Sequence, residues 1–104
     1  MIRKAYLMTL KPGSRSEYER RHNPIWPELQ TVLKQHGVCN YSIFYDDITE
    51  RLFAYAEIES EARWRQIADN EVCKRWWANM AELMLTHADH SPVTTDLECV
   101  FHLD

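Results

Sequence analysis

A tyrosine and a histidine, Tyr18 and His22, stand four residues apart in a segment whose pattern predicts a helix. Side chains with this spacing lie on one helix face, one turn from each other. Histidine has an ordinary pKa of about 6.5, which suits proton exchange at neutral pH. The pair could therefore enter one pocket in which His22 moves protons. The alternative is that both side chains only pack against the core and cap the helix end.

Three further aromatic residues, Tyr41, Trp76 and Trp77, could hold an organic ligand. Adjacent side chains on a helix point about 100° apart, so Trp76 and Trp77 cannot both point straight into one core. An aromatic ring can lie against the apolar face of a small ligand such as a sugar, while polar groups bind its hydroxyls. Tyr41, in the middle of a predicted strand, falls in the same class. Alternatively, these rings serve the core or a contact between subunits.

The remaining patterns predict neither a metal site nor a bound cofactor. His87 and His90 have a spacing that could coordinate a metal ion, but they lie in a polar loop without an identifiable third ligand. The cysteines, Cys39, Cys73 and Cys99, are odd in number and lack C-x-x-C spacing, which argues against a disulfide framework and against a zinc site. No glycine-rich phosphate loop is present.

The elements that must position these residues begin with a β-prone run, residues 2–10, which predicts a strand. Ser14 and Glu17 form an S-x-x-E pattern, which predicts a capping box at the start of a helix. We expect this helix to stop or kink near His22, because two prolines follow within five residues and disfavour helical angles before them.

A second helical segment is predicted from Pro27, which is tolerated as a first helical residue, to about His36. Gly37 follows as a natural C-cap. Two β-rich runs, residues 38–46 and 51–58, then predict a hairpin.

The second half of the chain predicts helices and a last strand. Ser60 caps one helical stretch, and an amphipathic stretch follows Asn70. Alternating apolar residues predict a strand over residues 93–103.

The predicted order is β-α-β-β-α-β within one domain, residues 1–104. This order is typical of the ferredoxin-like α+β fold, an antiparallel sheet with helices on one face. The other face stays uncovered, and we expect a second copy to bury it in a homodimer of the dimeric α/β barrel type.

Composition excludes several classes of partner. The 104 residues carry a net charge of −4 with acidic and basic residues interspersed, which argues against binding to nucleic acid. No apolar run approaches the roughly 20 residues that span a membrane, and the N-terminus lacks the apolar segment of a signal peptide. We therefore expect a cytoplasmic protein.

Two long motifs, RRHNPIWPEL at residues 20–29 and CKRWW at residues 73–77, resemble the L-rhamnose mutarotase family. The resemblance extends over essentially the whole chain and includes the MIRKA start, HGVCNYSI, EIESEARW and HSPV. It implies a ferredoxin-like homodimer without metal or cofactor in the cytoplasm. It also implies an isomerase that interconverts the α and β anomers of L-rhamnose.

Carried onto this sequence, the resemblance implies that His22 is the catalytic proton donor. It implies sugar contacts from four residues, namely Tyr18, Tyr41, Trp76 and Trp77. The complementary base stays open between a tyrosine, a carboxylate and a water. Other functions of the same dimeric fold, a cofactor-free monooxygenase or a metabolite-binding module, rest on analogy of fold alone.

Overall fold

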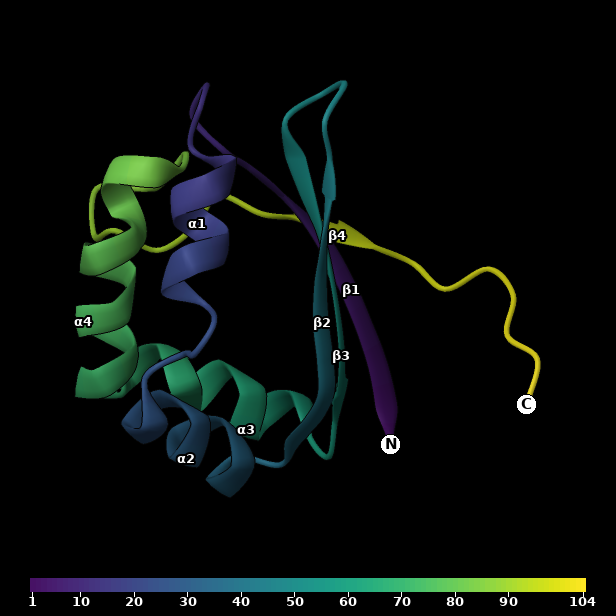
Figure 1. Ribbon diagram of the computed structural model, residues 1–104. Coiled ribbons are helices and arrows are strands. Elements are labelled where there is room, and N and C mark those ends of the chain that lie inside the picture. The colour runs from purple at the N-terminus through teal and green to yellow at the C-terminus, as the bar shows by residue number, and fades with distance from the viewer.

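A computed structural model describes residues 1–104 (Figure 1). The elements follow in the order β1 (Ile2–Thr9), α1 (Arg15–Arg21), α2 (Pro27–Gln35), β2 (Val38–Asp46), β3 (Arg51–Ile58), α3 (Glu61–Gln66), η1 (Ile67–Asp69), α4 (Glu71–Met80), η2 (Ala81–Leu83) and β4 (Thr95–Leu97). The predicted hairpin strands, β2 and β3, agree with the observed bounds. None of the helices has the length and apolar character needed to cross a membrane.

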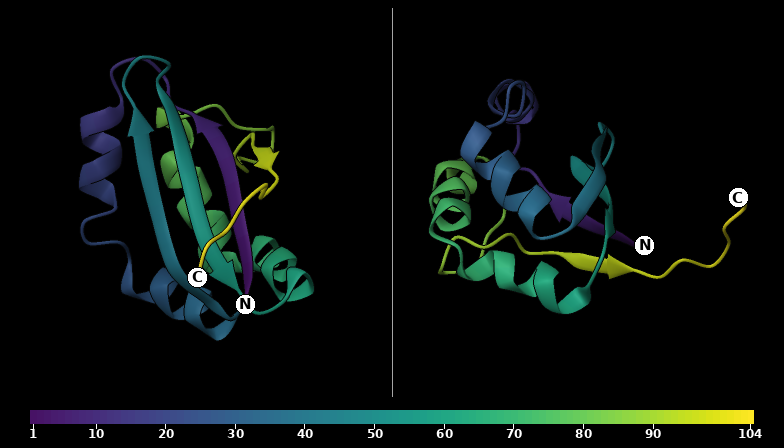
Figure 2. Two further views of the ribbon diagram at one scale, coloured as in Figure 1. Left: turned by 90° about the vertical axis from the view of Figure 1, so that its right-hand side faces the viewer. Right: turned by 90° about the horizontal axis from the view of Figure 1, so that it is seen from below.

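The four strands form one antiparallel sheet in the order β2-β3-β1-β4. All helices lie on one side of this sheet (Figures 1 and 2). The βαββαβ order with this strand arrangement is the ferredoxin-like fold, so the predicted fold class is confirmed. The buried side chains form one cluster, drawn from the sheet face that the helices cover and from the helices themselves.

The helix starts differ in how they are capped. Ser60 and Asn70 cap α3 and α4, since their side-chain oxygens accept hydrogen bonds from nearby backbone amides. The capping box predicted at α1 is wrong. Ser14 has helical backbone angles, φ −91° and ψ −4°, and its side chain makes no cap bond, because a capping side chain needs an extended backbone. Glu17 instead binds two arginines of its own helix.

The predicted last strand is too long. β4 spans Thr95–Leu97 only and pairs with the middle of β1, whereas residues 98–104 leave the sheet. Alternating apolar residues form a strand only where a neighbour offers hydrogen bonds, and beyond Leu97 no strand of the same chain pairs with them. Val100 and Phe101 are 94% and 76% exposed, and the segment projects from the side opposite the helices (Figures 1 and 2).

Candidate functional site

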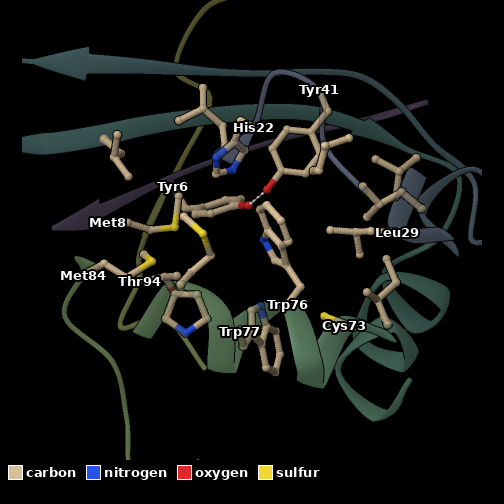
Figure 3. A pocket seen from close by; sticks show the side chains of 18 of the residues that line it. Tyr6, Met8, His22, Leu29, Tyr41, Cys73, Trp76, Trp77, Met84 and Thr94 are labelled. Atoms are coloured by element: carbon tan, nitrogen blue, oxygen red, sulfur yellow. Dashed lines mark hydrogen bonds between the residues drawn. The ribbon is translucent and has the colours of Figure 1, made fainter. Parts of the chain in front are cut away.

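A pocket of about 990 Å³ lies between the helix-covered face of the sheet and the helices. Its volume is at the upper end of the roughly 300–1,000 Å³ typical of small-molecule sites. The structure brings all five predicted site residues into its lining, which includes Tyr18, His22, Tyr41, Trp76 and Trp77. These residues come from α1 and its C-cap, β2 and α4, so the site depends on the tertiary fold. Figure 3 shows four of them, His22, Tyr41, Trp76 and Trp77.

His22 closes α1 as its C-cap, as the following prolines predict. Its Nδ1 lies 2.8 Å from the backbone oxygen of Tyr18. A carbonyl oxygen only accepts hydrogen bonds, so Nδ1 carries a hydrogen and Nε2 is the nitrogen left for a ligand. Burial lowers the pKa of His22, while the bond to Tyr18 opposes that shift. The ring is thus held in one orientation with one free nitrogen.

Aromatic rings surround this imidazole. The ring of Tyr18 stacks on it at 4.2 Å between centroids, and the ring of Trp76 meets it edge-on at 5.1 Å. Trp26 meets Trp76 in the same edge-on manner. Trp76 is buried and points from α4 into the pocket, whereas its neighbour Trp77 is only partly buried (Figure 3). The divergence expected from adjacent helix positions is confirmed.

Tyr41 reaches the pocket because of an irregularity in β2. The pairing of β2 with β3 shifts register between Cys39 and Ser42, and Asn40 has a left-handed backbone with φ 48°. One extra residue in a strand exchanges the faces of the residues that follow it. Val38 and Tyr41, three positions apart, therefore both face the helices, where regular alternation would have turned one of them outward.

Tyr6, on β1, is a pocket residue that the sequence analysis missed. Its hydroxyl and that of Tyr41 form a hydrogen bond within the pocket (Figure 3). Trp64 packs against both rings, each at 6.2 Å between centroids. Burial is the main cause that raises the pKa of each tyrosine, so both hydroxyls are neutral at pH 7. The alternation of Tyr6 with Met8 on one face of β1 was the available signal.

Thioether and thiol groups complete an apolar part of the lining. Met8 and Met84 lie together beside Tyr6 (Figure 3). Burial raises the pKa of the Cys73 thiol to about 11, so this sulfur is not a nucleophilic thiolate at neutral pH. Apolar surface of this kind fits carbon-bound hydrogens and methyl groups of a ligand.

The two loop histidines do not form part of a metal-binding cluster in this structure. His87 and His90 are exposed, and no group of three His, Cys, Asp or Glu side chains is arranged to hold a metal ion. Within the pocket, the one residue with an ordinary pKa near neutrality is His22. The arrangement as a whole, an imidazole with a free nitrogen among neutral hydroxyls and aromatic walls, can exchange protons with an uncharged, hydroxyl-bearing ligand.

Comparison with known proteins assigns the chain to a family. A family model described as L-rhamnose mutarotase matches residues 3–103. An L-rhamnose mutarotase from Tolumonas auensis is 55% identical over 103 residues, covering 99% of each chain. The crystal structure of an L-rhamnose mutarotase from Formosa agariphila, 40% identical, covers 100% of both chains with a TM-score of 0.92.

A more distant structure shares the fold alone. A dimeric ferredoxin-like protein from an uncultured marine organism is 8% identical, covers 98% of this chain and 95% of its own, and has a TM-score of 0.63. The family match and the high identity over full length go much further than that likeness. The resemblance noted in the sequence is therefore confirmed, and the chain belongs to the L-rhamnose mutarotase family.

Proposed function

We propose that the protein is an isomerase that interconverts the α and β anomers of L-rhamnopyranose, with His22 as the catalytic proton donor. One observation carries the residue assignment. His22 has a fixed ring whose Nδ1 is engaged by a backbone carbonyl, so that Nε2 is left for a ligand in a pocket lined mostly by hydrophobic residues. Family membership supports the reaction and the sugar.

The chemistry needs two proton movements and no redox step. The protonated Nε2 of His22 delivers its proton to the ring oxygen while a base takes the proton of the anomeric hydroxyl. The bond between the anomeric carbon and the ring oxygen breaks, and the anomeric C–O bond becomes a carbonyl. The aldehyde turns about one carbon–carbon bond, and the hydroxyl adds to its other face as both protons return. The same residues therefore serve both directions.

The aromatic residues supply binding. Trp76 and Trp77 offer apolar surface to the carbon-bound hydrogens and the methyl group of the 6-deoxy sugar. The hydroxyls of Tyr18 and Tyr41 can bond to sugar oxygens.

Saturation-transfer NMR on L-rhamnose tests the reaction directly, because it follows exchange between anomers at equilibrium. We expect exchange well above the rate in buffer. Oxygen consumption with an aromatic substrate would instead indicate a monooxygenase, and saturable binding of a sugar without faster exchange would indicate a binding module. Both of these alternatives rest on fold analogy, whereas the family match favours the isomerase.

A second copy of the chain is the proposed partner. The sheet face opposite the helices carries exposed apolar side chains on neighbouring strands, including Phe44, Phe53 and Leu97. The exposed C-terminal segment projects from the same side. Packing two such faces together buries both in a symmetric dimer. Light scattering across a dilution series should report twice 12.4 kDa, and a persistent monomer mass would remove this proposal.

We place the enzyme in the cytoplasm. All three cysteines are free, and Cys39 and Cys99 are exposed. Exposed thiols persist in a reducing compartment, whereas oxidising compartments convert such groups to disulfides. Recovery of the activity in the cytoplasmic fraction of a lysate tests the placement.

A further inference from the structure

Tyr6 has no part in the proton exchange proposed above, yet its hydroxyl lies inside the same pocket. The residue is 7% exposed, and the oxygen of Tyr41 is the side-chain partner of its hydroxyl. A hydroxyl can donate one hydrogen bond and accept two. Between two hydroxyls, one must donate and the other must accept, and this choice determines which proton remains for a ligand.

Burial decides the direction of this bond. If Tyr41 donated, the proton of the buried Tyr6 would have no acceptor among the other side chains of the protein, and burying an unpaired donor is costly. If Tyr6 donates, its proton is paired and the proton of Tyr41 points away from Tyr6. Both residues line the pocket, and the side chain of Tyr41 as a whole is more exposed to solvent than that of Tyr6, so the Tyr41 proton is the one with access to an acceptor in the pocket. The pKa directions agree, because the bond to Tyr41 adds to the rise that burial causes in the pKa of Tyr6, whereas the bond from Tyr6 opposes the rise that burial causes in the pKa of Tyr41.

We propose that Tyr6 is a positioning residue whose hydroxyl donates to the oxygen of Tyr41 and thereby directs the Tyr41 hydroxyl proton toward an oxygen of the bound sugar. Rigid neighbours hold the pair in place. Tyr6 stands on the central part of β1, opposite Ala54 of β3, and the ring of Trp64 packs against both tyrosines. Tyr41 follows the β2 bulge, where its own strand pairing is interrupted. The bond from the regular strand β1 therefore fixes a side chain on an irregular one.

The inference rests on the proposed function, because the acceptor is an oxygen of the sugar. Tyr6→Phe keeps the ring and removes only the bond. Without the bond from Tyr6, the Tyr41 hydroxyl is no longer directed toward the sugar. Loss of one neutral hydrogen bond between Tyr41 and the sugar corresponds to about a five-fold rise in KM. We expect kcat to stay within about two-fold, because the bond to the sugar exists both before and during ring opening. Anomer exchange at several L-rhamnose concentrations gives both constants.

A double-mutant cycle separates positioning from other roles. Tyr41→Phe should raise KM by at least as much as Tyr6→Phe, and adding Tyr6→Phe to Tyr41→Phe should change KM no further, since Tyr6 then has nothing to orient. Tyr55→Phe is the matched control. Its hydroxyl donates to Glu57 at 3.0 Å on the opposite face of the sheet, so its removal should leave KM unchanged.

The possible failures are distinguishable. If the wild-type protein does not speed anomer exchange, the proposed function is refuted, and the sugar acceptor with it. If the wild type exchanges anomers and Tyr6→Phe leaves KM unchanged, the positioning role alone is overturned. An equal KM effect of Tyr6→Phe in the presence and absence of the Tyr41 hydroxyl would also overturn it, because Tyr6 would then act independently of Tyr41.

Discussion

The two faces of the sheet are built from the same strands but have different chemistry. On β1, Tyr6 and Met8 face the helices and line the pocket, while Ala5 and Leu7 face the other way. The helix-covered face combines aromatic rings with hydroxyls and one imidazole. The opposite face presents exposed apolar residues such as Phe53 and no comparable set of polar groups in a pocket.

This contrast assigns a separate task to each face. Polar groups within the pocket are held by hydrogen bonds to defined partners, as with His22 and the backbone of Tyr18. The opposite face has large apolar groups and no helix over it, and of the C-terminal segment His102 and Asp104 contact Arg3 there. Changes on the helix-covered face should therefore alter exchange or folding, and changes on the opposite face should alter assembly. The following substitutions test this division.

The largest effect is expected from His22→Ala. A positioned general acid contributes about 10²- to 10⁴-fold, so anomer exchange should fall by that factor. The melting temperature and circular dichroism should change little, because the side chain lies at a helix end. The backbone hydrogen bonds of position 22 do not depend on the imidazole. Wild-type exchange in this variant would shift the assignment to Tyr18 or to an unassigned carboxylate.

Substitution of the two tryptophans should affect different properties, stability for Trp76 and KM for Trp77. Trp76 is 7% exposed and packs against two aromatic rings, so Trp76→Ala should lower the free energy of unfolding by about 3–5 kcal/mol, in addition to weakening the site. Trp77 is less buried, and Trp77→Ala should mainly raise KM. Thermal unfolding and exchange kinetics of both variants provide the measurements. Equal, small effects on melting and on KM would remove the roles assigned to both rings.

A charge on the opposite face should break the dimer without affecting the pocket. Phe53 pairs with Leu7 and Phe44 in the sheet register, at the centre of the proposed contact. Phe53→Asp buries a carboxylate in that contact, so light scattering should report 12.4 kDa, while exchange per chain stays close to wild type. Phe53→Leu is the control that keeps an apolar contact and should remain dimeric. A dimeric Phe53→Asp variant would contradict this interface.

The smallest effect is expected from metal removal. Exhaustive treatment with EDTA should leave anomer exchange unchanged, since the proposed chemistry uses only side-chain protons. A loss of activity that zinc or another divalent ion restores would contradict this prediction and make His87 and His90 candidate metal ligands.

Much of the fold could be predicted because local signals agreed with tertiary structure. The prolines after His22, the glycine after α2 and the alternation in β3 determine element ends and faces by local sterics and period. The length of β4 could not be predicted in this way. Alternation reports which residues could share a face, but strand pairing also requires a neighbouring strand, and the chain offers none beyond Leu97.

Part of the site could be predicted because local spacing along a helix places some of its residues together. Tyr18 and His22 share a helix face, so their spacing alone brings them together. The family resemblance, rather than spacing, supplied the roles of Tyr41 and Trp77. Tyr6 was missed because its partner Tyr41 lies 35 residues away, and because the bulge that turns Tyr41 inward depends on a left-handed Asn40 that the strand pattern does not reveal.

The dependence of kcat/KM on pH tests most directly the central claim that His22 is the proton donor, because this ratio reports the pKa of the free enzyme. Burial lowers the pKa of His22 below its ordinary value of about 6.5, and the protonated, donating fraction falls as the pH rises through that pKa. The account predicts that kcat/KM for anomer exchange decreases with rising pH below about pH 6.5, and that His22→Asn is slow and lacks this decrease. A ratio that rises over the same range, or a His22→Asn variant with the wild-type profile, would contradict it.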